Sequence, residues 1–160
     1  MSVRALAALC ASVGMLPIVA RAADAAARNP VYDTNCALCH QVAGAGLTGQ
    51  FPRLAGRVDR LALGADGRRY LASVVLNGLA GRIAVDGTPI SGLMPGFSSL
   101  TDADVASVLN YLTRLSDAKG KRPPPFSAKE VGAVRALGMA SPADVLAQRK
   151  ALAASGQMPE

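Results

Sequence analysis

The sequence predicts an all-α fold, with room for a small β-hairpin and a helical extension at the C-terminal end. Apolar residues recur at helical spacing over 66–79 and 101–115, and a capping sequence opens the second stretch. The turn dipeptide Asp86-Gly87, between two short β-favouring stretches, predicts the hairpin. With 160 residues the chain is long enough for one modest core and an appendage.

Residues 36–40 are Cys-Ala-Leu-Cys-His, a Cys-x-x-Cys-His motif that predicts covalent attachment of a c-type haem. On one helical turn, the thiols of Cys36 and Cys39 can form two thioethers with the porphyrin while the imidazole faces the iron. His40 is the single histidine of the chain, so it would be the proximal ligand, with a methionine expected on the opposite face. A buried macrocycle would also supplement a core in which only 4% of residues are aromatic.

Three other interpretations of this motif stay open. A zinc site needs about four ligands, and the motif offers two cysteines and one histidine without a second cysteine pair. A thioredoxin-like redox pair is expected beside a βαβ unit, whereas residues 31–35 favour a short helix. The pentapeptide could also occur by chance in a structural loop.

Residues 1–22 have the features of a secretory signal peptide. Arg4 precedes an apolar stretch over 5–20, and an Ala-x-Ala sequence ends at Ala22. We expect cleavage after about Ala22 and a periplasmic location. Because the stretch is shorter than the ~20 residues that cross a membrane, we expect no stable membrane span, with an uncleaved anchor as the alternative. Cys10 would leave with the signal, so no disulfide is expected in the mature chain.

The net charge of the full chain is +6, and the mature chain would stay mildly basic. The sequence has no Lys/Arg-rich block with interleaved aromatic residues, so we expect no nucleic-acid partner. A basic face could steer the protein toward acidic redox proteins. An ordinary solvated basic surface is the alternative explanation.

The segments around the motif carry a more specific pattern. Asn29-Pro30 predicts a helix start just before the motif, and the glycine-rich residues 44–49 predict a loop just after it. Pro52 follows His40 by 12 positions, within a Pro-x-Leu-x-Gly sequence. In this pattern residues 29–115 resemble the class I, mono-haem cytochromes c.

The resemblance implies one covalently attached haem c and roles for particular residues. The Pro52 carbonyl would accept the ring N–H of His40 and fix the orientation of the imidazole, and Leu54 would pack on the haem. An ordinary proline-containing turn is the alternative for this segment. The segment 92–97 contains a Met-Pro sequence where the family places its distal ligand, so Met94 is the expected second iron ligand.

Position in the chain distinguishes Met94 from other methionines. A methionine by default fills gaps in a core. Met15 falls in the expected signal peptide, and Met139 and Met158 lie beyond the region of resemblance. Met94 therefore remains as the candidate opposite His40.

The predicted organisation is a signal peptide over 1–22, a haem domain over 23–118, a proline-rich linker over 119–127 and a helical extension over 128–160. Capping sequences predict two helices in the extension, over 128–138 and 142–154. Their apolar residues are too few for an independent core, so we expect docking on the haem domain or on a partner. The expected anchors are Val131, Val134, Leu137, Val145, Leu146 and Leu152.

The resemblance implies a one-electron carrier and not an enzyme. The protein would serve as a free shuttle or as the cytochrome subunit of a dehydrogenase complex. Its partners would be a dehydrogenase as donor and an oxidase or another cytochrome as acceptor. The alternative is a peroxidase-like haem enzyme or a gas sensor with a displaceable distal ligand. A peroxidase needs a distal acid/base group, usually a histidine, and this chain has no second one.

Overall fold

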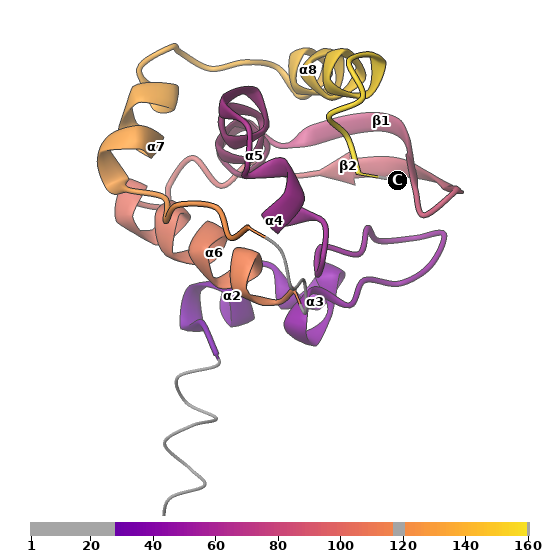
Figure 1. The fold of residues 1–160 in the computed structure, drawn as a ribbon, viewed down its shortest axis with the longest axis horizontal. Coiled ribbons are helices and arrows are strands. Elements are labelled where there is room, and N and C mark those ends of the chain that lie inside the picture. The colour runs from indigo at the N-terminus through magenta and orange to yellow at the C-terminus, as the bar shows by residue number, and fades with distance from the viewer. Residues whose placement is uncertain (1–27, 117–120, 160) are drawn as a thin grey trace, which may run out of the picture.

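The computed structural model describes residues 28–116 and 121–159, and it confirms a mainly helical fold with one small antiparallel sheet (Figure 1). In chain order the elements are α2 (Pro30–Asn35), α3 (Ala37–His40), the 3-10 helix η1 (Val42–Gly44), α4 (Val58–Leu61), α5 (Ala65–Asn77), β1 (Leu79–Val85), β2 (Thr88–Met94), α6 (Asp102–Arg114), α7 (Ala128–Arg135) and α8 (Pro142–Ala154). Among these residues no helix is both long and apolar enough to cross a membrane. The expected signal peptide over 1–22, its cleavage site and the expected domain boundary at 118–119 lie outside the described residues.

Helices α2 and α6 pack against each other through two tyrosines. The predicted start of α2 is confirmed, since the Asn29 side chain accepts the N–H of Tyr32 at 2.9 Å and donates to the Ser107 hydroxyl of α6 at 2.7 Å. Tyr32 is fully buried, and its ring centroid lies 5.0 Å from that of Tyr111. The predicted capping sequence of α6 is also confirmed, because the Thr101 hydroxyl accepts a backbone N–H of the first turn. The N-terminal helix is therefore fixed to the last helix before residue 116.

Helix α5 leads directly into the hairpin. The apolar repeat over 66–79 corresponds to α5, which ends at Asn77 and is capped by Gly78. The hairpin turns at Asp86-Gly87 as predicted, and its register runs from Leu79 opposite Met94 to Val85 opposite Thr88. The strands extend beyond the stretches 82–85 and 88–91 that predicted the hairpin. This register places Met94 beside the end of α5.

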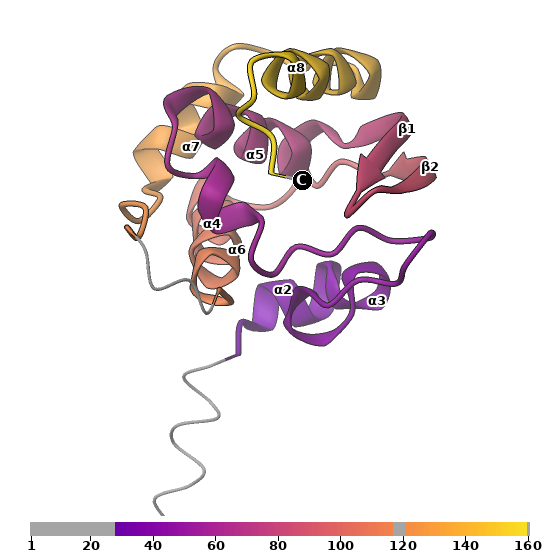
Figure 2. The same ribbon diagram turned by 45° about the vertical axis from the view of Figure 1, so that its right-hand side comes forward.

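The C-terminal helices cover the side of the molecule formed by α5, α6 and β1. Helix α7 packs on α6 and α5, and α8 lies across α5 and β1 (Figures 1 and 2). Val131, Val145 and Leu152 are buried and belong to the same core cluster as the residues of α5 and α6. Leu137, expected as an anchor, is 73% exposed, because α7 ends at Arg135 and not at 138.

Candidate functional site

The Cys-x-x-Cys-His motif lies at the junction of α2 and α3. The backbone N–H of Cys36 donates to the Tyr32 carbonyl at 2.8 Å, and its own carbonyl accepts the N–H of His40 at 2.9 Å. The thiols of Cys36 and Cys39 are free and partly exposed on this turn. Burial, with a smaller effect of neighbouring Cys39, raises the pKa of the Cys36 thiol to about 11. The Cys36 thiol is therefore protonated at neutral pH.

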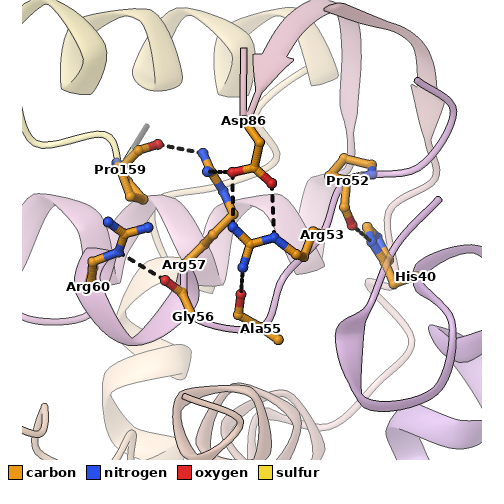
Figure 3. A network of polar contacts seen from close by, with 9 residues as sticks. All are labelled: His40, Pro52, Arg53, Ala55, Gly56, Arg57, Arg60, Asp86 and Pro159. Carbon is orange, nitrogen blue, oxygen red and sulfur yellow. Dashed lines mark hydrogen bonds and ion pairs between the residues drawn. The ribbon is translucent and has the colours of Figure 1, made fainter. Parts of the chain in front are cut away.

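His40 is 7% exposed, and its Nδ1 lies 2.9 Å from the carbonyl oxygen of Pro52 (Figure 3). A carbonyl oxygen only accepts, so Nδ1 carries the proton and Nε2 keeps its lone pair. Burial lowers the pKa of His40, and the hydrogen bond to Pro52 opposes this with a smaller effect. The imidazole is therefore neutral, in the tautomer that leaves Nε2 able to bind a metal ion.

A loop that folds back on itself brings Pro52 to His40. The N–H of Gly46 donates to the His40 carbonyl at 2.9 Å, which turns the chain directly after the motif. Gly46 has φ +70°, and a Cβ at this position would lie 2.5 Å from the backbone nitrogen of Arg53. Only glycine fits so close to the returning strand of the loop. The glycine-rich sequence after the motif is thus what allows the contact between Pro52 and His40.

Met94 is held by the end of α5. Gly78 caps this helix with φ +80°, and a Cβ there would overlap the Met94 carbonyl oxygen and lie 2.8 Å from the nitrogen of Gly96. The N–H of Phe97 also donates to the Val75 carbonyl of α5 at 2.8 Å. The Met-Pro segment is therefore fixed on both sides, and a side chain at Gly78 would displace it.

A mainly apolar cavity, partly open to solvent, lies between these segments. Five of the six residues predicted for the site form part of its wall: Cys36, His40, Pro52, Leu54 and Met94. Cys39 lies on the same turn as Cys36 but not on this wall. Aliphatic side chains of α5 and α6 make up much of the remainder. An apolar wall with a free imidazole nitrogen, a thioether and adjacent thiols has the chemistry that fits a haem.

Arginines line one side of the cavity, and sequence reasoning missed them. Arg53 donates two hydrogen bonds of 2.9 Å to Asp86, and Arg57 donates to the same carboxylate at 2.7 Å (Figure 3). These arginines, Arg53 first, hold the pKa of Asp86 below its usual range. Arg57 also donates to the Pro159 carbonyl, near the far end of the chain. Its side chain is 6% exposed, and burial lowers its pKa.

The C-terminal region also contributes to the cavity wall, which the sequence did not indicate. Arg149 of α8 donates to the Ala84 carbonyl at 2.9 Å and lies 3.4 Å from the Tyr70 hydroxyl. Arg149 and Met158 are both on the wall. Although Met158 lies far from Met94 in the sequence, both side chains line the same cavity. The distinction between them rests on the resemblance and on the way Gly78 fixes the Met94 segment.

Known proteins share this sequence pattern. A family model described as Cytochrome c matches residues 26–116. A cytochrome c-552 of Thermus thermophilus is 45% identical over 119 residues, which cover 73% of this chain and 90% of that protein. A second cytochrome c-552 of the same organism has the same identity over 80% of its length. The cytochrome c subunit of a quinone-dependent alcohol dehydrogenase of Gluconobacter oxydans is 36% identical over 86 residues, 52% of this chain and 17% of that subunit.

Proposed function

Because the chain belongs to the cytochrome c family, as a class I member, we propose that it is a periplasmic one-electron carrier whose haem iron is bound by His40 and Met94. Proteins of this family transfer electrons and are not enzymes, and this chain carries one haem c. The observation that carries the proposed ligation is the common cavity wall of His40 and Met94. When bound, the haem supplies an iron that can be reduced and oxidised by one electron.

The residues of the chain would prepare this site before any electron arrives. Pro52 accepts the Nδ1 proton of His40, so the imidazole cannot rotate freely and Nε2 would be available to bind the iron. We assign the two thioether bonds to Cys36 and Cys39. A histidine and a methionine together leave no open position on the iron, and they raise its reduction potential relative to two histidines. These properties favour electron transfer over the binding of a small ligand.

We infer that residues 1–22 direct the protein to the periplasm and are removed there. The electron donor would be a dehydrogenase, and the acceptor an oxidase or another cytochrome. Similarity to a dehydrogenase cytochrome subunit supports a role inside a complex, whereas similarity to cytochrome c-552 supports a free shuttle. Size-exclusion chromatography of untagged periplasmic extract separates these roles, because a subunit elutes with its dehydrogenase and a shuttle elutes alone.

The proposed iron ligands are tested by the near-infrared band that an iron–sulfur bond would give in the ferric protein. Met94→Ala should abolish this band and lower the reduction potential, because the thioether favours the reduced iron. Met158→Ala is the matched control, since Met158 lies on the same cavity wall. Met139→Ala is a second control at a side chain that is 89% exposed. Loss of the band in Met158→Ala with its retention in Met94→Ala would make our ligand assignment wrong.

Covalent attachment is tested by haem staining of a denaturing gel. The wild-type protein should give one stained band, and Cys36→Ala or Cys39→Ala should weaken or abolish it.

The intact mass of the purified protein gives the start of the mature chain and checks cleavage after about Ala22. A wild-type protein without haem staining would contradict the proposed function as a whole.

A further inference from the structure

The arginines on one side of the cavity carry more positive charge than Asp86, which forms ion pairs with two of them, can neutralise. The positive charges of Arg149, Arg53 and Arg60 each lower the pKa of Arg57, so each of these three side chains lies close enough to Arg57 to repel its guanidinium group. Within residues 28–116 and 121–159, Asp86 is the one acid that forms ion pairs with them. A buried arginine in such a cluster is stabilised by a further anion.

A basic cleft adjoins the apolar cavity. The two spaces share Arg57 and Arg149 in their walls, and the cleft adds Arg82 and Lys150. Arg57 and Arg149 therefore lie where an apolar space meets a basic one. A ligand that fills both spaces needs an apolar body and negative charge at one edge.

A haem has this distribution, because its ring is apolar and its two propionate carboxylates extend from one edge. An ionised carboxylate is costly to bury without a partner, and arginine binds carboxylates through two parallel N–H bonds. On the basis of the proposed function, we propose that Arg57 and Arg149 bind the haem carboxylates. The C-terminal region then binds the cofactor directly, through α8.

The surroundings of Arg149 suit this role. The Ala84 carbonyl of β1 and the hydroxyl of Tyr70, which is 4% exposed, position the guanidinium. A guanidinium has five N–H donors, so these two contacts leave others for a carboxylate. Arg57 is fixed in the same way by Asp86 and by the Pro159 carbonyl. Both side chains are thus oriented by contacts with protein groups.

Resonance Raman spectra of the full-length holoprotein contain a bending band of the haem carboxylates, which tests this inference. Arg149→Gln should shift the band, because a carboxylate loses its paired donor. Arg149→Lys keeps the charge without the two parallel N–H groups, so it should shift the band less. Arg57→Gln should also shift it. Arg82→Gln is the matched control, since Arg82 is exposed and lines only the basic cleft.

An unchanged band in the Arg149 variants, with haem attached, would overturn the inference and leave the proposed function intact. A shift of equal size in Arg82→Gln would also overturn it, because a general change of surface charge would then explain the result. If the buried Arg57→Gln variant does not fold, the more exposed Arg149 variants decide the question alone. A wild-type protein without haem would instead contradict the proposed function.

Discussion

Residues 28–116 and residues 121–159 contribute to one core but are held in it by different interactions. In the first region, whole aliphatic faces of α5 and α6 are buried, together with the tyrosine pair between α2 and α6. In the second region each helix buries only one or two side chains, Val131 in α7 and Val145 and Leu152 in α8. The second region therefore gains less from apolar burial for each residue that it orders.

Polar contacts in fixed directions add to this small apolar area. Arg135 of α7 donates to Asp102 and to the Leu100 carbonyl, both at 2.7 Å. The Asn110 side chain donates to the Phe126 carbonyl at 2.9 Å and accepts the Phe126 N–H at 2.7 Å. Such bonds require one geometry, so they determine where the helices lie, while apolar burial supplies most of the favourable free energy. Two modest sets of interactions together replace one large core.

Deletion of residues 119–160 tests this comparison, and we expect it to have the largest effect on stability. The haem domain should still fold and take up haem, because the family pattern is complete by residue 115. It would lose the burial of Phe126, Val131, Val145 and Leu152. We expect a loss of about 3 kcal/mol or more, which lowers the thermal midpoint of a domain of this size by more than about 10 °C. Thermal midpoints of the full and truncated holoproteins measure this.

The deletion also separates stability from partner recognition. A lower midpoint with unchanged electron-transfer rates to the natural partner would indicate that the C-terminal region serves the haem domain. Equal midpoints with slower electron transfer would indicate that it serves the partner. Equal midpoints together with unchanged rates would contradict both roles.

A matched pair of core substitutions asks whether the two regions unfold together. Val131 of α7 and Val108 of α6 are buried to the same extent, at 0% and 1% exposure. Val131→Ala and Val108→Ala should each cost about 2 kcal/mol, from two lost methyl groups and a small cavity. In urea, the haem absorbance and the far-ultraviolet circular dichroism should shift together in both variants. A haem transition that moves in Val108→Ala alone would show that the C-terminal region unfolds separately.

The sequence predicted the features that depend on near neighbours. The cap at Asn29, the capping sequence at Thr101 and the turn at Asp86-Gly87 each require only a few adjacent residues, and the structure has all three. The contact between the His40 ring and the Pro52 carbonyl was instead what the resemblance to class I cytochromes c implied, and the structure has this contact. The predicted lengths of the helices were less accurate, since α7 ends at Arg135 and not at residue 138.

The arginine side of the cavity could not be predicted in this way. Arg57 meets Pro159, which lies 102 positions further along the chain, and Arg149 meets Tyr70 from 79 positions away. No periodicity or short motif encodes a contact over such separations. An arginine on a helix surface is by default solvated, so its sequence gives no sign that it lines a cavity. Such contacts follow only from the docking of α8 on β1.

The contact between Arg68 of α5 and Glu130 of α7 gives the smallest predicted effect. Arg68 donates to both carboxylate oxygens, at 2.6 and 2.7 Å, and lies 3.8 Å over the ring of Phe126. The hydrogen bonds from Arg68 hold the pKa of Glu130 below its ordinary value. A carboxyl group with a lowered pKa in the folded state stabilises that state above the pKa of the unfolded chain. This contribution is lost as the pH falls through the lower, folded value.

Glu130→Gln should therefore destabilise the protein by about 1 kcal/mol at pH 7, because the carboxylate is about a third exposed and partly screened. Since the wild-type carboxylate becomes protonated in acid, the difference between the two proteins should shrink as the pH falls from about 6 to about 3. Urea unfolding at several pH values measures that difference. Asp66→Asn is the control, since the Asp66–Arg69 pair is more than half exposed and should contribute almost nothing at any pH. A difference for Glu130→Gln that stays constant with pH would show that the glutamate acts through packing and not through its charge. Among the residues that the structure describes, the polar attachment of α7 would then depend on Arg135.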